Sequence, residues 1–292
     1  MGYAYRNKVA LVTGASSGIG EAFAWALARR RMQLILVARS EDKLRRLASK
    51  LAHEYRVRVE VVAADLADQD ALSRLLAEVD RLEMPVDLLI NNAAIGCYGP
   101  FETIAPECDR RQVMLNVGAV VDLTHSVVPG MLARGGGAIV NVGSVLSFWP
   151  QPYDAVYAAS KAFVLSFSQA LAAEYEQRGL RVVALCPGST KTGFGKAAGS
   201  PAPRARFGNL GNLLVRRPEQ VVLTAIKGLE SGKVVNVDGR LNRIAVRGQH
   251  VLPRMLIARL VAARPRAPLP APARGAAATE AGTQGSRTER GE

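Results

Sequence analysis

The feature that most constrains the fold is the regular alternation of short Val/Ile/Leu-rich runs with longer segments of helical periodicity. Strands are expected at 8–14, 33–39, 58–66, 86–94, 137–144, 180–188 and 233–237, and helices at about 18–31, 40–55, 68–82, 107–133, 154–177 and 218–232. Strands that are apolar throughout and separated by helices indicate a parallel sheet covered on both faces. With right-handed crossovers, the pattern predicts an α/β fold, a Rossmann-type doubly wound parallel sheet of about seven strands.

The net charge and the cysteines bear on the partners of the protein and on its cellular compartment. The net charge of +13 is uneven and lies in no recognised nucleic-acid-binding motif, so we expect no nucleic-acid partner. The three cysteines, Cys97, Cys108 and Cys186, are odd in number and form no CxxC, which argues against a disulfide framework and fits a reducing compartment. Without a visible secretory signal or an uncharged apolar run of ~18 residues, we expect a cytoplasmic protein.

A glycine-rich turn directly follows the first expected strand. The segment TGASSGIG places Gly14, Gly18 and Gly20 between that strand and the first helix. Glycines let the backbone approach a pyrophosphate closely, and the helix N-terminus offers free N–H groups and the positive end of its dipole. In this position the turn predicts a dinucleotide site rather than a plain strand–helix connection.

The end of the second strand distinguishes NAD from NADP. An acid there would accept a hydrogen bond from the ribose 2′-hydroxyl, but the chain has Arg39 followed by Ser40. Arg39 can pair with a 2′-phosphate, so we expect NADP(H) in preference to NAD(H); the alternative is an ordinary surface arginine. Asp65 and Asn92 end the next two strands, where open α/β sheets bind ligands, although Asp65 also suits a turn or cap. Asn91 is expected to be structural.

A tyrosine and a lysine stand four residues apart in the helix expected at 154–177. Tyr157 and Lys161 would share one face of that helix, although such a pair can also be a solvated face. A unit charge about 4 Å away contributes ~4 kcal/mol at an effective dielectric constant of 20, which can lower a phenol pKa by roughly 3 units. We therefore expect Lys161 to make the Tyr157 proton transferable near neutral pH. Ser144, at the end of the fifth strand, can donate to a developing alkoxide, with Ser147 as the competing serine.

Taken in order, the motifs resemble those of the short-chain dehydrogenases/reductases. The likeness covers residues 8–190 and comprises TGASSGIG, NNAA, the Asn of MLNVGA, the Ser of NVGS, YAASK and LCPGSTKT. The resemblance implies a catalytic set of Asn116, Ser144, Tyr157 and Lys161. It also implies that Asn116 holds a water linking Lys161 to solvent, and that the nicotinamide lies beside Pro187, Gly188 and Thr192. The family usually has glycine where this chain has Ala94, which puts the local turn geometry in doubt.

The expected cofactor contacts come from the glycine turn, the strand ends and the resemblance. They are Gly14, Ser16, Ser17, Gly18, Ile19, Gly20, Arg39, Ser40, Asp65, Leu66, Asn92, Ala93, Tyr157, Lys161, Pro187, Gly188 and Thr192. No metal site is expected, because the histidines, cysteines and acids are dispersed. Residues 193–217 are Gly-rich and basic, and we expect a lid over the site. The candidate wall residues, each of which can equally belong to the core, are Trp149, Tyr153, Phe194 and Phe207.

These features predict an NADPH-dependent oxidoreductase that interconverts a carbonyl and a secondary alcohol on an apolar small molecule such as a ketoacyl or other ketone compound. The alternatives are an NAD-linked alcohol dehydrogenase and a non-catalytic NADP-binding regulatory protein. The segment GRLNRIAVRGQHVLPR is similar to C-terminal segments of the branch with 3-oxoacyl-thioester reductases and hydroxysteroid dehydrogenases.

The C-terminal part differs in character from the rest. We expect residues 1–240 to form one catalytic domain, 241–263 a basic amphipathic segment, and 264–292 a disordered tail rich in Pro, Ala and Gly. The stretch 251–263 can contact a membrane surface or an acyl carrier, or can pack on its own domain. The long helices at 107–133 and 154–177 are candidate faces for a homodimer or homotetramer.

Overall fold

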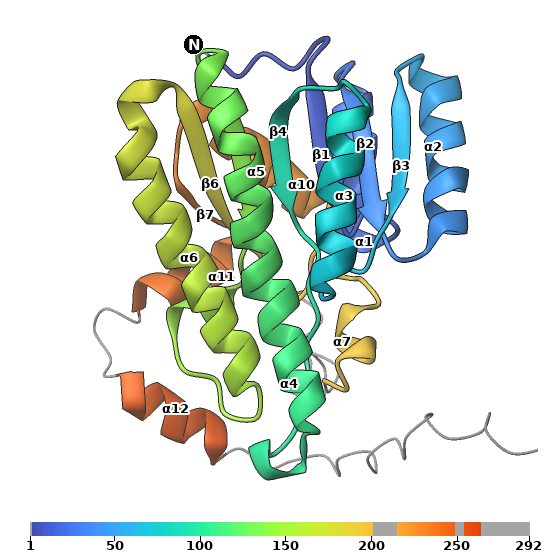
Figure 1. Cartoon of the computed structure of the whole chain (residues 1–292). Helices are drawn as coiled ribbons and strands as arrows, with labels where there is room; N and C mark the ends of the chain where they lie inside the picture. The colour runs from blue at the N-terminus through green and yellow to red at the C-terminus, as the bar shows by residue number, and fades with distance from the viewer. Residues whose placement is uncertain (1, 201–214, 249–253, 264–292) are drawn as a thin grey trace, which may run out of the picture.

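The computed structural model describes residues 2–200, 215–248 and 254–263. Within these ranges the strands form one parallel sheet of seven strands in the order β3-β2-β1-β4-β5-β6-β7 (Figure 1). The strands are β1 (Val9–Thr13), β2 (Gln33–Ala38), β3 (Val59–Ala63), β4 (Val86–Asn91), β5 (Gly137–Val142), β6 (Leu180–Cys186) and β7 (Val235–Val237). The strand order reverses direction between β1 and β4, as in doubly wound sheets, which confirms the predicted fold class.

Helices cover both faces of the sheet, as Figure 1 shows. One face packs against α1 (Gly18–Ala28), α2 (Glu41–Tyr55) and α10 (Pro218–Ser231). The other face packs against α3 (Gln69–Arg81), α5 (Ala119–Ala133) and α6 (Ala155–Tyr175). The remaining helices are α4 (Pro106–Val113), α7 (Phe194–Ala197), α11 (Arg240–Gly248) and α12 (Arg254–Ala262), with short helical turns η1 (Phe101–Thr103), η2 (Met114–Gly118), η3 (Val145–Phe148) and η4 (Glu176–Arg178).

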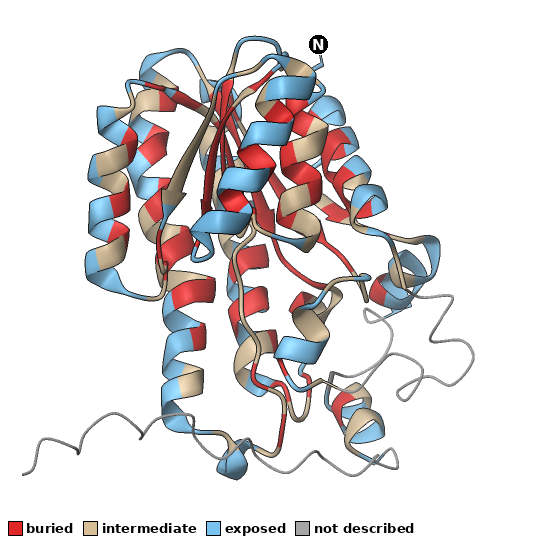
Figure 2. Cartoon of the chain, turned by 90° about the vertical axis from the view of Figure 1, so that its right-hand side faces the viewer, coloured by how far each residue is buried: buried red, intermediate tan, exposed pale blue. Residues whose placement is uncertain are grey.

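The central strands are apolar on both sides because both sides are covered. In β1, Ala10 and Val12 join the core under α1 and α10, whereas Val9 and Leu11 join the core under α3 and α5. Successive side chains of a strand point to opposite faces, so a strand between two helical layers has no polar face. Figure 2 shows the result, with buried strands at the centre and exposed residues on the outer faces of the helices.

The predicted helix at 107–133 is one continuous element made of α4, η2 and α5. Its middle, η2, is a π-helical turn, which the sequence did not indicate. The helix Pro106–Ala133 contains an 18-residue stretch with a mean hydropathy of 1.2, which is long and apolar enough by composition to cross a membrane. Its residues Leu123, Val127 and Met131 pack into the core against the sheet, which is the arrangement of a core helix in a globular protein.

The first six expected strands are present but shorter at their carboxyl ends, whereas the seventh ends at Val237 as expected and begins later, at Val235. The third strand stops at Ala63, because Asp65 folds into a turn in which its carboxylate accepts a hydrogen bond from the Ala67 N–H at 3.1 Å. The residues after β4 and β5 likewise leave the sheet. These released ends form one edge of the sheet, where the candidate site lies. Part of the expected lid, 201–214, and the expected tail, 264–292, lie outside the described residues.

Candidate active site

The glycine turn joins β1 to α1 in a tightly packed conformation. Gly14 and Gly18 have φ of 64° and 62°, in the left-handed region that favours glycine. A Cβ on Gly20 would lie 2.3 Å from the Gly14 carbonyl oxygen, so no larger residue fits there. Ser17 precedes the helix in an extended conformation, and its hydroxyl makes no capping hydrogen bond. The N–H groups of the first turn of α1 therefore lack a side-chain cap, which fits a pyrophosphate as their partner.

Asn92 fixes the ends of β1 and β4 against each other. Its side-chain amide donates to the carbonyl oxygens of Thr13 at 2.9 Å and Gly14 at 3.4 Å. The Thr13 hydroxyl accepts hydrogen bonds from the backbone N–H groups of Asn92 and Ala93, at 2.9 and 3.0 Å. Asn92 thus braces the glycine turn, and sequence reasoning missed Thr13, whose signal is a hydroxyl residue directly before Gly14.

Asn91 lies on the opposite side of β4 and belongs to the core. Its amide nitrogen donates to the side-chain oxygens of Asn141 at 2.9 Å and Thr124 at 3.3 Å. These polar side chains are buried, and each bond satisfies a group that would otherwise be costly to bury. The structural role predicted for Asn91 is therefore confirmed. Ala94 does not take a left-handed φ, so its methyl group is compatible with this turn.

Asp65 and two arginines form a charged cluster near the expected adenine ribose. Asp65 pairs with Arg111, at the C-terminal end of α4. Burial acts to raise the pKa of Asp65, but the Ala67 N–H, Arg111 and Arg39 together lower it below its ordinary value. Arg39 is exposed at the end of β2, where it can reach a ligand. Arg111 was missed by sequence reasoning, because it lies 46 residues from its partner.

The predicted catalytic side chains converge at the carboxyl ends of β5 and β6. Ser144 follows β5, and its side chain acts on the Tyr157 hydroxyl from α6 so as to lower the pKa of that phenol. The Ser144 oxygen also accepts from the Leu146 N–H at 3.1 Å, and the competing Ser147 accepts instead from the Ser144 N–H. Lys161 is 3% exposed and donates from Nζ to the Val142 carbonyl oxygen at 2.8 Å. Ser144 therefore faces the tyrosine, whereas Ser147 orients the turn.

The expected acidification of Tyr157 by Lys161 is wrong, because the pKa of Tyr157 is raised and not lowered. Burial, followed by the Asp154 carboxylate, raises the pKa of Tyr157 well above its ordinary value, and the bond from Ser144 offsets this only in part. Burial also lowers the pKa of Lys161 to about 8, against a smaller opposing effect of Cys186. The ammonium lies 5.7 Å from the Tyr157 ring centroid and is bonded to a backbone carbonyl. Desolvation thus outweighs the attraction that sequence spacing suggested.

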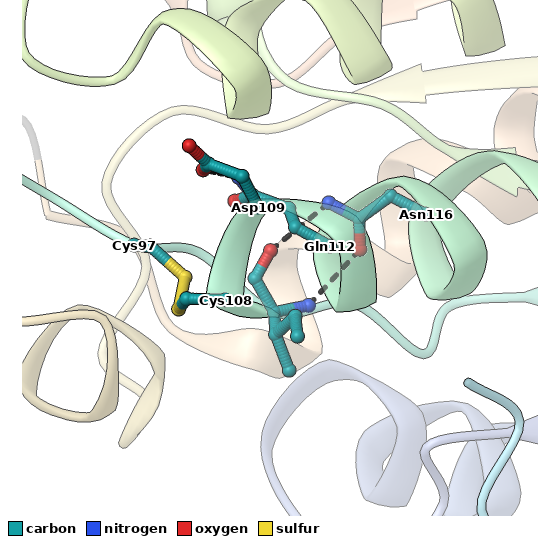
Figure 3. Close-up of a disulfide and its surroundings, with 6 residues drawn as sticks. Cys97, Cys108, Asp109, Gln112 and Asn116 are labelled. Carbon is teal, nitrogen blue, oxygen red and sulfur yellow. Dashed lines mark hydrogen bonds between the residues drawn. A yellow bond between two sulfur atoms is a disulfide. The ribbon is translucent and has the colours of Figure 1, made fainter. Parts of the chain in front are cut away.

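Asn116 lies in the π-helical turn η2 and is fully buried. Its side chain accepts from the Ile95 N–H at 3.0 Å and donates to the Ile95 carbonyl at 2.9 Å, as Figure 3 shows. The same amide nitrogen donates to the Ser160 hydroxyl at 3.1 Å, and Ser160 in turn donates to the Tyr157 carbonyl at 2.7 Å. Asn116 therefore links the loop after β4 to α6, and the water relay expected for it stays a prediction.

Cys97 and Cys108 form a disulfide, which corrects the expectation that the cysteines do not pair. Cys97 lies in the loop after β4, two residues after Ile95, and Cys108 lies in the first turn of α4. The disulfide therefore connects that loop to α4 (Figure 3). The two cysteines are only 11 residues apart, but the intervening loop folds back so that their Cα atoms are 6.5 Å apart. Cys186 is buried and free, and burial raises its pKa to about 12. Cysteine usage therefore no longer supports a reducing compartment.

The loop after β6 closes over the glycine turn. A Cβ on Gly18 would lie 2.9 Å from the Thr192 methyl group, so Thr192 covers the turn directly. The Pro187 carbonyl accepts from the Val145 N–H at 2.9 Å, which ties this loop to η3. A Cβ on Gly188 would lie 2.3 Å from the Asn242 side chain, so α11 packs tightly against the loop. Of the three residues predicted to lie beside the nicotinamide, Thr192 therefore contacts the glycine turn, Pro187 contacts the turn after Ser144, and Gly188 contacts α11.

The candidate wall residues have different surroundings. The Phe194 ring packs against the Tyr157 ring, with centroids 5.4 Å apart. Tyr153 packs against Tyr98 with centroids 6.4 Å apart. Trp149 is half-buried, and Phe207 lies outside the described residues. A small cavity beside the disulfide is lined by Cys97, Gly99, Phe101, Ile104, Asp109, Tyr153, Ala155 and Val156. Among the described residues, no group of three or more His, Cys, Asp or Glu could hold a metal ion.

Comparison with known proteins agrees with this geometry. Residues 8–202 match the family model of the short chain dehydrogenases. The very-long-chain 3-oxoacyl-CoA reductase of Anas platyrhynchos is 36% identical over 215 residues, covering 69% of this chain and 68% of that protein. The protein of the same name from Bos taurus is 34% identical over 182 residues, covering 61% of this chain and 58% of its own. The match to the bovine protein therefore spans less than two thirds of its length.

Solved structures extend the likeness over most of the fold. A short-chain dehydrogenase from Sphingobium yanoikuyae, in complex with NADPH, is 32% identical with a TM-score of 0.74 and covers 94% of this chain and 100% of that one. A structure of 7beta-hydroxysteroid dehydrogenase is 25% identical with a TM-score of 0.80, and covers 90% of this chain and 100% of that one. The chain therefore belongs to the short-chain dehydrogenase/reductase family and is an NAD(P)-dependent oxidoreductase acting on CH–OH groups.

Proposed function

We propose that the protein is an NADPH-dependent reductase that converts the carbonyl of an apolar substrate, such as a 3-oxoacyl compound or a bulky ketone, into a secondary alcohol. The observation that carries this proposal is the convergence of Ser144, Tyr157 and Lys161 at the sheet edge that also holds the glycine turn, with the Lys161 ammonium 5.7 Å from the Tyr157 ring centroid. Two neighbouring hydroxyl groups can bind one carbonyl oxygen, and one of them can give it a proton.

In the proposed mechanism, bound NADPH would supply the hydride to the carbonyl carbon. Ser144 and Tyr157 bind the carbonyl oxygen, and Tyr157 transfers its phenolic proton to that oxygen as negative charge develops. The raised pKa of Tyr157 keeps the phenol protonated at neutral pH, which is the form that reduction requires. Lys161, buried beneath the tyrosine ring, supplies a positive charge that stabilises the phenolate left behind. Asn116 and Ser160 hold α6 in register with the loop after β4.

Arg39 supports NADPH as the preferred cofactor. Arg39 is exposed at the end of β2, and Asp65, the acid on which it acts, is already paired with Arg111. NADPH is the bound cofactor of the similar structure from Sphingobium yanoikuyae and of the L-sorbose reductase from Gluconobacter frateurii. A guanidinium at this position would bind the 2′-phosphate by charge-assisted hydrogen bonds, whereas an acid there would repel it.

The cofactor proposal is tested by the ratio of kcat/KM for NADPH to that for NADH. Arg39→Asp should lower this ratio by roughly tenfold or more, because an attraction for the 2′-phosphate becomes a repulsion. Arg46→Asp, an equally exposed change on α2, is the matched control and should leave the ratio unchanged. An unchanged ratio in Arg39→Asp would favour the NAD-linked alternative.

The apolar substrate is supported by the lining of the site. The Phe194 ring packs against the ring of the catalytic tyrosine, with centroids 5.4 Å apart, so an apolar side chain borders the reacting hydroxyl. Similar proteins carry names with very different substrates, from very-long-chain 3-oxoacyl-CoA to sulfoacetaldehyde and L-sorbose. Following NADPH absorbance with one compound of each kind should give the highest kcat/KM for 3-oxoacyl thioesters or bulky ketones. A preference for sulfoacetaldehyde or sorbose would overturn this assignment, and no turnover of any compound would favour a regulatory NADP-binding protein.

A further inference from the structure

The two C-terminal helices carry half of the large exposed apolar side chains among the described residues. On α11 these are Leu241 and Ile244, and on α12 they are Met255, Leu256 and Leu260. Their exposed fractions run from 44% for Leu256 to 65% for Ile244. Single exposed apolar residues are ordinary, but a concentration on two short helices marks an interaction surface. We name these five residues the C-terminal apolar face.

Arginines flank this face, and the nearest acid in the sequence, Asp238, is buried and paired with Arg216. Arg240, Arg243 and Arg247 are exposed on α11 at spacings of three and four, so they form a stripe beside Leu241 and Ile244. The opposite side of α11, at Val246, is buried against the protein. Helix α11 thus has three sides, one buried, one apolar and one cationic.

Helix α12 repeats the combination. Met255 and Arg259 are four residues apart, as are Leu256 and Leu260, and all four are exposed. Ala258, on the other side, is buried. Between residues 240 and 263 the chain contains no Asp or Glu. Apolar side chains flanked by arginines are complementary to a partner in which hydrocarbon lies next to negatively charged groups.

We propose that α11 and α12 together dock on an anionic lipid membrane, with the C-terminal apolar face entering the headgroup region and the arginines binding lipid phosphates. A second copy of the chain is a poorer partner, because a symmetric contact would bring the same arginines against each other. Residues 264–292 are also poorer, since they are basic at the start and contain one large apolar residue, Leu269.

The C-terminal apolar face lies close to the candidate active site. Helix α11 packs against η3, the turn that begins after Ser144, and its Asn242 packs against Gly188 in the loop of the site. Figure 1 shows α11 and α12 in the same half of the molecule as α7, at the end where the strands terminate. A membrane bound at α11 and α12 would therefore lie near the active site. The docking surface itself is argued independently of the proposed reductase activity.

The test measures binding of the full-length protein to sedimented vesicles. One set contains phosphatidylcholine alone and a second set contains phosphatidylcholine with phosphatidylglycerol, each at low and high salt. Binding should favour the anionic vesicles and weaken at high salt, because phosphate contacts are screened. The variant Ile244→Ser/Leu260→Ser should bind at least about tenfold more weakly, since two inserted apolar side chains are lost. Arg243→Gln/Arg247→Gln should weaken binding to anionic vesicles by about tenfold or more.

Matched controls keep the result interpretable. Leu223→Ser changes a leucine of similar exposure, 50%, on α10, and Arg46→Gln/Arg74→Gln removes two exposed arginines elsewhere. Both should bind as the unaltered protein does, and thermal melting should show that all variants fold. Absence of vesicle binding, or equal binding by all variants, would overturn the proposal. Two further results would overturn it by assigning the surface to another partner. One is light scattering that shows a dimer in the unaltered protein and a monomer in the Ile244→Ser/Leu260→Ser variant. The other is binding of the unaltered protein to a purified acyl carrier protein, but not to vesicles, with loss of that binding in the same variant.

Discussion

The ammonium of Lys161 lies 5.7 Å from the centre of the Tyr157 ring, beneath the phenol and directed at the Val142 carbonyl rather than at the hydroxyl. Both groups are desolvated, so each is pushed toward its neutral form. The pKa of Tyr157 is raised and that of Lys161 is lowered to about 8. A neutral phenol is a proton donor, so this arrangement suits reduction at neutral pH better than oxidation.

The two directions of the reaction should therefore respond differently to pH. Reduction needs protonated Tyr157, and a raised pKa keeps that form filled through the neutral range, so kcat for reduction should stay level until Lys161 loses its proton near pH 8. Oxidation needs the phenolate, so its kcat should rise with pH across the same range. Steady-state kinetics in both directions between about pH 6 and 10 tests this. A reduction rate that climbs with pH in the neutral range would contradict it.

Burial of the Lys161 ammonium should lower the free energy of unfolding at neutral pH. Its folded pKa of about 8 lies below the ordinary 10.5, so between these pH values the unfolded chain binds more protons. Unfolding free energy should accordingly rise with pH from about 8 to about 10.5. Lys161→Met should abolish turnover, raise unfolding free energy at neutral pH by about 1–2 kcal/mol and remove this pH dependence. Urea titrations at several pH values measure the effect, and a destabilised Lys161→Met would argue against it.

Ser160 should act as a positioning residue through Asn116. Ser160→Ala removes the acceptor for the Asn116 amide and should lower kcat by about tenfold with little change in KM, because α6 loses its register with the loop after β4. Ser168→Ala is the matched control, since Ser168 makes the same kind of buried bonds on α6, to Val164 and Asn141, away from the site. Each variant should lose about 1–2 kcal/mol of unfolding free energy. Equal kcat values in the two variants would leave Ser160 a purely structural role.

The disulfide should stabilise the loop after β4. Cys97→Ser/Cys108→Ser should lower unfolding free energy by about 2–3 kcal/mol, the range expected for closing a short loop. Added dithiothreitol should lower the Tm of the unaltered protein toward that of the double variant and leave the variant itself unchanged. If dithiothreitol has no effect on the Tm and free thiols are titrated at all three cysteines, the pairing is absent in solution.

The long helices should support self-association. Val113 and Met114 in the α4–α5 helix and Phe163 on α6 are exposed apolar residues on elements that pack side by side. We expect a homodimer by light scattering, which Phe163→Asp should convert to a monomer, because a buried charge without a partner opposes association. Leu223→Asp, on α10, should leave the mass unchanged. A monomeric unaltered protein would rule out this face.

Much of the fold could be predicted because its signals are local. Apolar runs between helical segments indicated all seven strands, and the glycine turn indicated where a dinucleotide would bind. Thr13, Arg111 and Ser160 could not be predicted in the same way, since each acts on a partner that only the fold brings near. The Cys97–Cys108 bond was missed because a count of cysteines carries no information about how the intervening loop folds.

The raised pKa of Tyr157 also could not be predicted from the sequence, because it depends on an energy balance inside the folded protein. Four-residue spacing does place Tyr157 and Lys161 on one side of α6, as predicted. Spacing does not reveal that β5 contributes the Val142 carbonyl to the ammonium, or how far both groups are removed from water. The balance between attraction and desolvation is therefore a property of the packed protein.

The measurement that tests the central claim most directly is single-turnover reduction by Tyr157→Phe, with NADPH affinity measured separately by fluorescence titration. The substitution removes only the hydroxyl that donates the proton, so the rate should fall by about 10²–10⁴ while NADPH affinity changes less than threefold or so. A Tyr157→Phe protein that reduces the carbonyl at the unaltered rate would show that the proton comes from another group.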